Sequence, residues 1–248
     1  MCKRRGFTPL ETAISNRGSK RFLTGFTLVE LLIVIAIIAL LMAIMMPALQ
    51  KVREQGKAAV CQSNLRQIGT GAALYADYYA SYVPRGAAGR TREAWYQLFM
   101  PFLAQKAINK DYCNVEIYRC PSYPDKAQTV CYVVNGWAFN SKNDMTGYEI
   151  RDPTKLMPIR HRASTIYLAD NEHGSWRPII KRTDDAGTDL CDVWHPGHMP
   201  LSNSQDRNRG RRIARARHRE GGNCLYLDWH VEWVAADKMT IDMWRFHK

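Results

Sequence analysis

A cysteine and two histidines have the spacing in this chain that most suggests site chemistry. Cys191, His195 and His198 form a C-x3-H-x2-H pattern. Thiolate and imidazole bind zinc, but a structural zinc normally has four closely defined ligands and no Cys-x-x-Cys pair accompanies this pattern. Cys191 beside a histidine could also act as a nucleophile, yet the sequence has no nucleophile elbow, Walker loop or Gly-rich dinucleotide-binding turn. We therefore expect no metal, no cofactor and no enzymatic activity.

A second group of donor residues lies near the C-terminus. His218, Asp228 and His230 surround a segment in which apolar and polar residues alternate, NCLYLDWHVEWV. This alternation on both sides of a short connection predicts a β-hairpin. We expect His218 and Asp228 to hydrogen-bond across the base of that hairpin.

An arginine-rich stretch contributes to a formal net charge of +12. Runs of like charge are usually solvated, but guanidinium groups also bind phosphate and sulfate. The run is therefore a candidate site for DNA outside the cell, anionic glycans or lipid headgroups. Aromatic residues do not interleave with it, which disfavours recognition of single strands. The candidates are Arg207, Arg209, Arg211, Arg212, Arg215, Arg217 and Arg219.

One apolar segment is long enough to cross a membrane. Phe26–Leu49 would form about 36 Å of helix, against a hydrocarbon core of ~30 Å. Six basic residues precede it against the single acid Glu11, so the positive-inside rule places the N-terminus in the cytoplasm and the C-terminal part outside. Glu30 lies near the start of this segment, where a buried charge costs roughly 2.5–3.5 kcal/mol and needs a partner.

The residues around this acid resemble a known processing signal. Gly25 followed by FTLVELL resembles the cleavage and methylation signal of type IV prepilins and type II secretion pseudopilins, with a basic leader, glycine as its last residue, and phenylalanine first and glutamate fifth in the mature chain. Pro47 lies where pilin helices commonly kink. A second copy, GFTPLE at Gly6–Glu11, lacks an apolar continuation and is interpreted as a decoy or a relic.

The resemblance implies both processing and assembly. A prepilin peptidase would cut between Gly25 and Phe26 and methylate the new amine. Glu30 would pair with the Phe26 amine of a neighbouring pilin or pseudopilin subunit as their helices stack in the membrane lipid. These residues would then be the cleavage, methylation and assembly positions of the chain.

Helical spacing continues beyond the apolar segment. An apolar stripe steps by three and four residues, as in an amphipathic helix, through Cys61, Leu65, Ile68, Ala72, Tyr75 and Tyr79. Pro and Gly residues in 83–90 end it. We therefore predict a leader at 1–25, a transmembrane helix at 26–49, an amphipathic helix at 50–82 and an exported head domain at 83–248.

The head domain is predicted to be α+β, with the long helix packed on a small antiparallel sheet in a pilin-like plan. Residues 94–103 read as a short helix. Few helices separate the expected strands, which favours antiparallel pairing. The expected strands are Ile117–Cys120, Val130–Asn135, Thr165–Asp170, Asn223–Leu227 and Val231–Val234.

The head also resembles a prepilin-type domain whose C-terminal signature is His, nine residues, then Asp-Gly. The segments CQSNLRQIG, RCPS, STIYLAD and HREGGNCLYLDWHVEW carry this likeness. His218 and Asp228 keep the spacing, but Trp229 replaces the glycine, so the turn type stays open. The contexts of Cys61 and Cys120 make them the first candidates for a disulfide.

Other pairings and a calcium site remain open at this point. Six cysteines follow the leader, which allows fifteen connectivities. Some pseudopilins of this plan carry a calcium loop, and residues 181–189 (KRTDDAGTD) offer oxygen ligands without EF-hand spacing.

The leading hypothesis is a pseudopilin or minor pilin of a type II secretion or type IV pilus-like system. It would be held as a single-pass protein in the inner (cytoplasmic) membrane, with its head periplasmic or extracellular. The alternative is a tethered module that never assembles and binds extracellular polyanions through its arginine run. In neither case do we expect an intracellular nucleic-acid partner.

Overall fold

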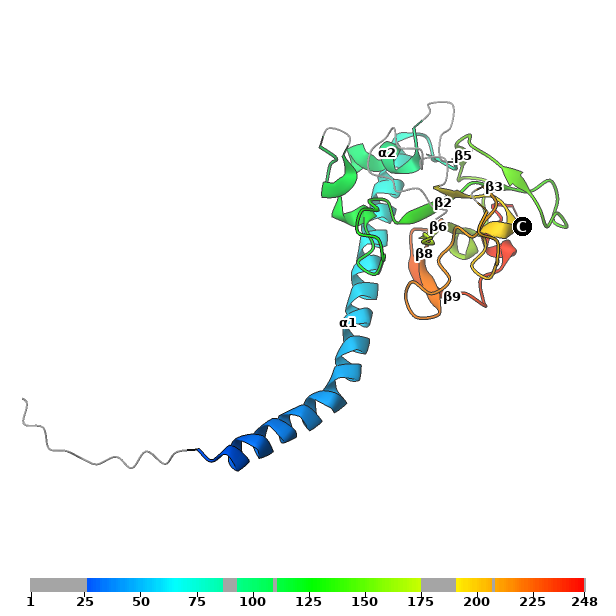
Figure 1. Cartoon of the computed structure of the whole chain (residues 1–248). Coiled ribbons are helices and arrows are strands. Elements are labelled where there is room, and N and C mark those ends of the chain that lie inside the picture. Colours follow the sequence, from blue (N-terminus) through cyan, green and yellow to red (C-terminus); the bar gives the residue numbers. More distant parts are fainter. Residues whose placement is uncertain (1–25, 87–92, 109–110, 175–190, 207, 248) are drawn as a thin grey trace, which may run out of the picture. The chain divides into compact units, whose positions relative to one another are not determined.

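The computed structural model describes residues 26–86, 93–108, 111–174, 191–206 and 208–247. The chain divides into two compact units, residues 1–48 and 49–248. Figure 1 colours both along the sequence.

Helix α1 spans Leu28–Tyr78, with Pro47 inside it. In its first half every described side chain is exposed, and of the described helices this one is long and apolar enough to cross a membrane. It ends at Tyr78 rather than at residue 82, because Ala80 and Ser81 adopt left-handed φ angles of 51° and 66°. Such angles cannot continue a right-handed helix.

A five-stranded sheet forms the centre of the head, in the order β7-β2-β6-β8-β9. Strands β2, β6, β8 and β9 are antiparallel to their neighbours, whereas β7 pairs parallel to β2 at the edge. The predicted α+β class is confirmed, with this parallel edge pair as a departure. The strands are β2 (Tyr132–Asn135), β6 (Ile166–Asp170), β7 (Asp192–Val193), β8 (Gly221–Tyr226) and β9 (Val231–Ala235).

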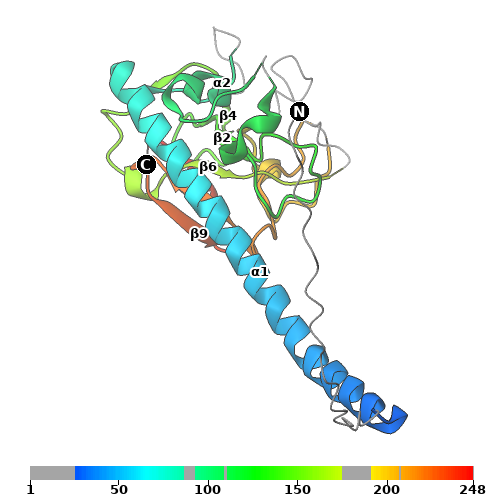
Figure 2. The same cartoon turned by 90° about the vertical axis from the view of Figure 1, so that its left-hand side faces the viewer.

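The head-domain part of α1 packs against one face of this sheet (Figure 2). The predicted stripe is buried from Cys61 to Tyr75, in one core with Leu168, Leu225 and Leu227. A Cβ atom on Gly69 would lie 2.9 Å from Cδ1 of Leu225. The glycine therefore lets helix and strand approach closely, which offsets its poor helix propensity of about 1 kcal/mol.

A second apolar cluster covers the opposite face of the sheet. It includes Trp137, Ile166, Tyr226 and Trp244. Alternation along the strands explains the division, since Leu225 lies in the first cluster and Tyr226 in the second. Both faces are thus covered over β2, β6 and β8, whose residues are all buried, whereas the edge strand β9 is partly exposed.

Short elements complete the head. The 94–103 prediction corresponds to α2 (Trp95–Phe99) and the 3₁₀ helix η1 (Met100–Phe102). Two two-stranded sheets pair β1 with β5 and β3 with β4. The remaining elements are β1 (Tyr82–Val83), β3 (Trp137–Ala138), β4 (Tyr148–Glu149), β5 (Thr154–Lys155), η2 (Tyr112–Asn114), η4 (Arg162–Ser164), η6 (Pro196–His198) and η7 (Ile241–Trp244).

One predicted strand, Ile117–Cys120, is wrong. Its residues lie in and just after a 3₁₀ helix, η3 (Glu116–Tyr118). Ile117 and Tyr118 are buried, so their apolar character reflects packing in the core. A short apolar run is ambiguous in this way because burial alone produces it.

The C-terminal hairpin forms as predicted, with Leu225 paired to Val231 in its last register position. The Tyr226 N–H donates to the His230 carbonyl and the Trp229 N–H to the Tyr226 carbonyl. Trp229 has a φ of 73°. This is a three-residue connection with a left-handed third residue, where glycine is usually found.

Candidate functional site

The first site is the start of α1, where Thr27 and Glu30 bond to each other. Oε2 of Glu30 accepts hydrogen bonds from the Thr27 N–H at 2.8 Å and the Thr27 hydroxyl at 2.7 Å. The Glu30 N–H in turn donates to Oγ1 of Thr27 at 3.2 Å. This reciprocal pair is a capping box, which satisfies free N–H groups at a helix start. Glu30 therefore has a partner inside its own chain.

Around this cap, the apolar side chains lie on the surface of the helix. Phe26 is 71% exposed and Leu28 is 78% exposed, while Gly25 lies outside the described residues. A helix that is apolar on every side requires lipid or other apolar helices around it.

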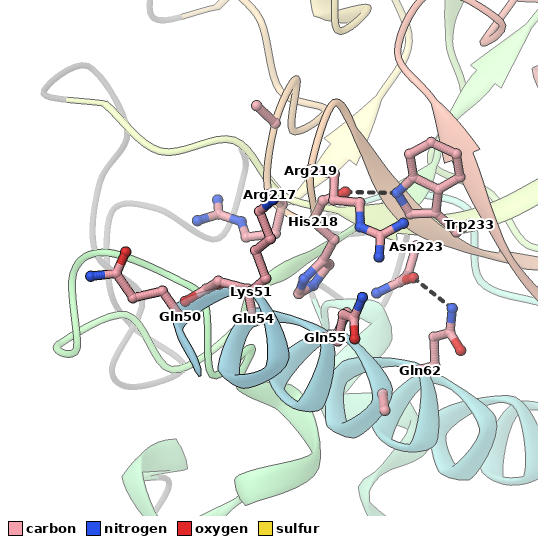
Figure 3. A pocket seen from close by; sticks show the side chains of 13 residues that line it. Gln50, Lys51, Glu54, Gln55, Gln62, Arg217, His218, Arg219, Asn223 and Trp233 are labelled. Atoms are coloured by element: carbon pink, nitrogen blue, oxygen red, sulfur yellow. Dashed lines mark hydrogen bonds between the residues drawn. The ribbon is translucent and has the colours of Figure 1, made fainter. Parts of the chain in front are cut away.

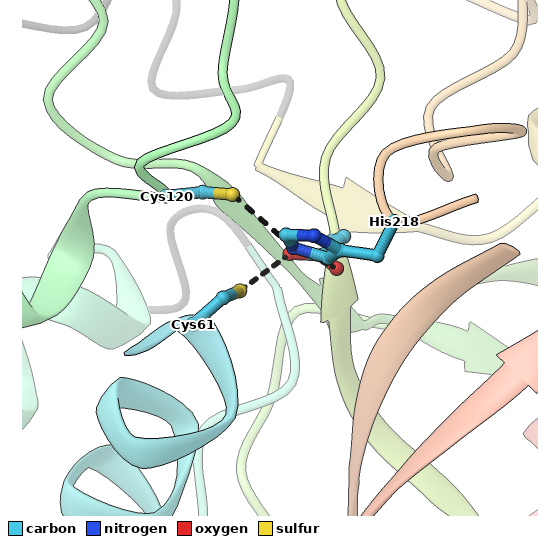
Figure 4. A group of neighbouring side chains, drawn as sticks. Cys61, Cys120 and His218 are labelled. Atoms are coloured by element: carbon cyan, nitrogen blue, oxygen red, sulfur yellow. Dashed lines mark hydrogen bonds and ion pairs between the residues drawn. The ribbon is translucent and has the colours of Figure 1, made fainter. Parts of the chain in front are cut away.

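The second site is a cluster of four buried side chains in the head. Cys61 comes from α1, Cys120 from the segment after η3, Asp170 from the end of β6 and His218 from the loop before β8. One donor atom of each lies within 4.8 Å of the others. Figure 4 shows Cys61, Cys120 and His218 converging on one point.

Hydrogen bonds hold these side chains in place. Sγ of Cys61 donates to Oδ1 of Asp170 at 3.2 Å, and Nε2 of His218 lies 3.4 Å from Sγ of Cys120. Outside the cluster, the Tyr132 hydroxyl lies 3.4 Å from Sγ of Cys61. The Asn223 N–H donates to Oδ2 of Asp170 at 2.7 Å.

The cluster shifts the pKa values of its members in opposite directions. Burial raises the pKa of the Cys61 thiol well above its usual value and raises that of Asp170 to about 6. The Cys61 thiol and His218 lower the pKa of Cys120 to about 5. Burial opposes protonation of His218, but Cys120 and Asp170 raise its pKa overall. The site therefore favours negative charge on Cys120 and positive charge beside it.

The predicted Cys61–Cys120 disulfide stays a prediction. The two cysteines do come together, but the structure has both as free thiols. Each sulfur has a polar partner instead, Asp170 for Cys61 and His218 for Cys120. Cys131, Cys191 and Cys224 are also free and buried.

The predicted hydrogen bond between His218 and Asp228 is wrong. Strand β8 lies between them, and six extended residues span about 20 Å. His218 is buried at one end of the strand. Asp228 lies in the exposed turn at the other end, where its Oδ1 is 2.5 Å from Nδ1 of His230.

Several arginines of the predicted polyanion site are already engaged. Nε of Arg211 lies 2.6 Å from the Glu172 carboxylate, and Arg212 pairs with the buried Asp192. Arg217 stacks on the Tyr123 ring at 4.2 Å. Arg207 lies outside the described residues, so the exposed members among those described are Arg209, Arg215 and Arg219.

A pocket of about 910 Å³ lies beside the cluster, between α1 and the residues around β8 (Figure 3). His218 belongs to both the pocket wall and the cluster. The basic residues Lys51, Arg217 and Arg219 also line the pocket, together with the acidic Glu54. Of the four donors, His218 therefore forms part of the wall of this pocket.

The other metal candidates of the sequence do not converge in this way. Nδ1 of His198 accepts the Trp194 N–H at 3.1 Å and its Nε2 lies 2.8 Å from the Asn208 carbonyl. Nδ1 of His195 accepts the Gly197 N–H. The calcium candidate at 181–189 lies outside the described residues.

Sequence reasoning missed the buried cluster because its members are far apart along the chain. One signal was present: Asp170 ends the apolar segment STIYLAD, and an acid that closes a buried strand needs a polar partner. Nothing in the sequence alone identified Tyr132 or Asn223 as neighbours of that site.

Comparison with known proteins gives one result, at the N-terminus. Residues 24–46 match the prokaryotic N-terminal methylation motif. No curated protein and no solved structure matches the chain. The motif is consistent with a prepilin-type, membrane-anchored protein, and among the described residues the apolar start of α1 is the part long and apolar enough to cross a membrane.

Proposed function

From its N-terminal methylation motif we propose that this chain is a pseudopilin or minor pilin subunit. A prepilin peptidase cuts between Gly25 and Phe26 and methylates the Phe26 amine. The subunit then assembles through its N-terminal helix into a structure of the type II secretion or type IV pilus kind. Its role is structural rather than enzymatic.

The motif at residues 24–46 carries the proposal. Six basic residues before the apolar segment support a cytoplasmic N-terminus and a head on the outer side of the inner membrane. The exposed apolar surface of α1 between Phe26 and Leu49 supports storage in lipid before assembly. Neighbouring subunits then replace lipid around the same surface.

Glu30 has two consecutive roles in this proposal. In the single chain it caps α1 through Thr27. After cleavage, the Phe26 amine of a neighbouring subunit carries a positive charge, with a typical pKa of about 8. Pairing with that amine offsets the cost of a carboxylate in lipid and sets the register between subunits.

Three variants separate the cap from the charge. Glu30→Gln keeps a side chain that can cap the helix but removes the charge, so we expect normal membrane insertion and no incorporation into filaments. Glu30→Leu should also fail to assemble. Thr27→Val removes the hydroxyl of the cap and keeps the charge, so it should still assemble.

Incorporation is measured by the amount of each variant in sheared or purified filaments relative to the membrane fraction. Wild-type levels of Glu30→Gln in filaments would refute the pairing. Loss of Thr27→Val together with normal Glu30→Gln would show that capping alone matters.

The cleavage site has its own test, because the chain contains a matched control. Gly25→Val should leave an unprocessed chain in the membrane, whereas Gly6→Val in the GFTPLE copy should leave processing unchanged. N-terminal mass spectrometry of the wild type should find methylated Phe26. A mature chain that still begins at Met1, or one that begins at Phe7, would contradict the proposal.

A further inference from the structure

The four side chains of the buried cluster offer the donor set of a zinc site. Two sulfurs, one imidazole nitrogen and one carboxylate oxygen face one another, from Cys61, Cys120, His218 and Asp170. Structural zinc is bound by four such ligands in a tetrahedron. Thiolates favour zinc over magnesium or calcium, which prefer oxygen ligands.

The spacing of the donors fits that geometry. Zinc lies about 2.3 Å from sulfur and ~2.0–2.2 Å from nitrogen or oxygen, so tetrahedral ligands are about 3.3–3.8 Å apart. Sγ of Cys61 lies 3.2 Å from Oδ1 of Asp170, and Nε2 of His218 lies 3.4 Å from Sγ of Cys120. Nε2 of His218 and Oδ2 of Asp170 are 3.5 Å apart. Taking one atom per residue, the four donors lie within 4.8 Å of one another, so the widest pairs must close by up to about 1 Å to surround one ion.

Because the four donors are buried, negative charge on them would be stabilised by a bound cation. Cys61 and Asp170 are 0% exposed, Cys120 is 3% exposed and His218 is 4% exposed. A buried carboxylate beside two thiols is costly unless it is paired or bound to a metal. Two thiolates and one carboxylate around Zn²⁺ leave one negative charge, and the buried Arg217 guanidinium lies on the adjacent Tyr123 ring.

The surroundings already orient the donors. The Tyr132 hydroxyl lies against Cys61 and the Asn223 N–H donates to Asp170. At metal sites, groups that hydrogen-bond to the metal ligands hold those ligands in position. The pocket that His218 lines (Figure 3) offers an entry path for the ion.

A disulfide or a set of hydrogen bonds explains less of this arrangement. A Cys61–Cys120 bond would use two of the four donors and leave only the contact between Nε2 of His218 and Oδ2 of Asp170, at 3.5 Å. Hydrogen bonds join the donors in pairs, Cys61 with Asp170 and Cys120 with His218. One ion would bind all four donors at the same point.

We propose that Cys61, Cys120, Asp170 and His218 bind one zinc ion, which fixes the head-domain part of α1 to the sheet. The ion joins four segments that are distant in sequence, so it acts as a cross-link. This proposal goes beyond the assembly role and is independent of processing at Gly25.

The test measures zinc in the full chain, purified in detergent under reducing conditions. Mass spectrometry of the elements should find one zinc per chain, either as purified or after dialysis against zinc. Replacement by Co²⁺ should give the sulfur-to-cobalt charge-transfer band and the intense visible bands of a tetrahedral site. A wild-type chain that binds neither ion overturns the proposal without any variant.

Variants assign the ligands. Cys61→Ser and His218→Gln should lose the bound zinc, whereas Cys224→Ser should keep it, because Cys224 is a buried cysteine of the opposite cluster. Tyr132→Phe keeps all four ligands and should weaken binding about 10-fold, a change readable even where a ligand variant fails to fold.

Two results would overturn the assignment. One is full zinc content in Cys61→Ser or His218→Gln. The other is a Cys61–Cys120 disulfide in peptide maps of protein that was never reduced. Because zinc can be measured in the unprocessed chain, failure here leaves the filament experiments on Glu30 unaffected.

Discussion

Arg212 and Asp192 form an ion pair with both side chains buried in the head. The guanidinium also donates to the Asp192 carbonyl at 2.9 Å and the Asn208 carbonyl at 2.8 Å. This pair lies inside the stretch that looks, from its sequence, like a solvated basic loop. At least part of the arginine run is therefore structural.

Breaking the pair should be strongly destabilising. Arg212→Met removes the guanidinium from the buried Asp192 carboxylate, and breaking a buried ion pair by removing one member costs about 3–5 kcal/mol. Arg209→Met, at an exposed arginine of the same run, should change stability by less than about 0.5 kcal/mol. Urea unfolding of the full chain in detergent, followed by tryptophan fluorescence, measures both. Equal midpoints for the two variants would argue against a structural role.

At the left-handed residue of the hairpin turn, we expect glycine to give a more stable protein than alanine. Trp229 has a φ of 73° and its ring packs edge-on to Tyr167 at 6.0 Å. Trp229→Ala and Trp229→Gly both lose that packing, but only alanine keeps the backbone strain. Trp229→Gly should therefore be the more stable of the two by about 1 kcal/mol. Thermal unfolding checks the order, and a more stable alanine variant would contradict the turn.

Two glycines of α1 should respond in opposite ways to a side chain. A Cβ on Gly71 would lie 2.5 Å from Cδ2 of Leu103, whereas one on Gly56 would meet nothing within 4 Å. Gly56→Ala should stabilise the helix by up to about 1 kcal/mol. Gly71→Leu should cost roughly 1–3 kcal/mol through overpacking. Chemical denaturation measures both, and a stabilised Gly71→Leu would refute the close approach.

Asp144, in the loop before β4, should make the stability of the head domain decrease at acid pH. The N–H groups of Gly147, Asn140 and Thr146 donate to Asp144 and lower its pKa below the usual value. Because the folded pKa is depressed, this stabilisation is present above the unfolded pKa of about 3.9 and is lost as pH falls through the folded value.

Asp144→Asn tests this by keeping an oxygen acceptor and removing the charge. The variant should lose the part of the stability change that wild type shows below about pH 4. Nuclear magnetic resonance of the Asp144 carboxyl carbon should show a midpoint below that of a model aspartate. A midpoint at the ordinary value would exclude the three hydrogen bonds.

The sequence predicted correctly those helices and strands whose apolar residues recur with a regular period. The stripe beginning at Cys61 and the alternation after Asn223 have clear periods of 3.6 and 2, and both elements form. Ile117–Cys120 failed because a short buried segment has the same composition as a strand. Helix α1 ends before residue 82 because Ala80 and Ser81 turn left-handed, which their side chains do not indicate.

The buried site was less accessible to such reasoning. The resemblance brought Cys61 and Cys120 together, but as a disulfide. Asp170 joins them only because β6 lies between β2 and β8, an order that no local pattern specifies. His218 and Asp228 do not meet because strand β8 lies between them. Non-local convergence of this kind appears only in the folded chain.

The order of strands in the central sheet also bears on how the chain is made. Strand β8 lies beside β6, and the loop before β8 brings His218 against Cys61 of α1. The cluster therefore contains residues from a part of the chain that is synthesised early and a part that is synthesised later. A nascent chain arrested before residue 218 would lack both the closing hairpin and the last donor of the cluster, so the head can mature only after the hairpin residues have been synthesised.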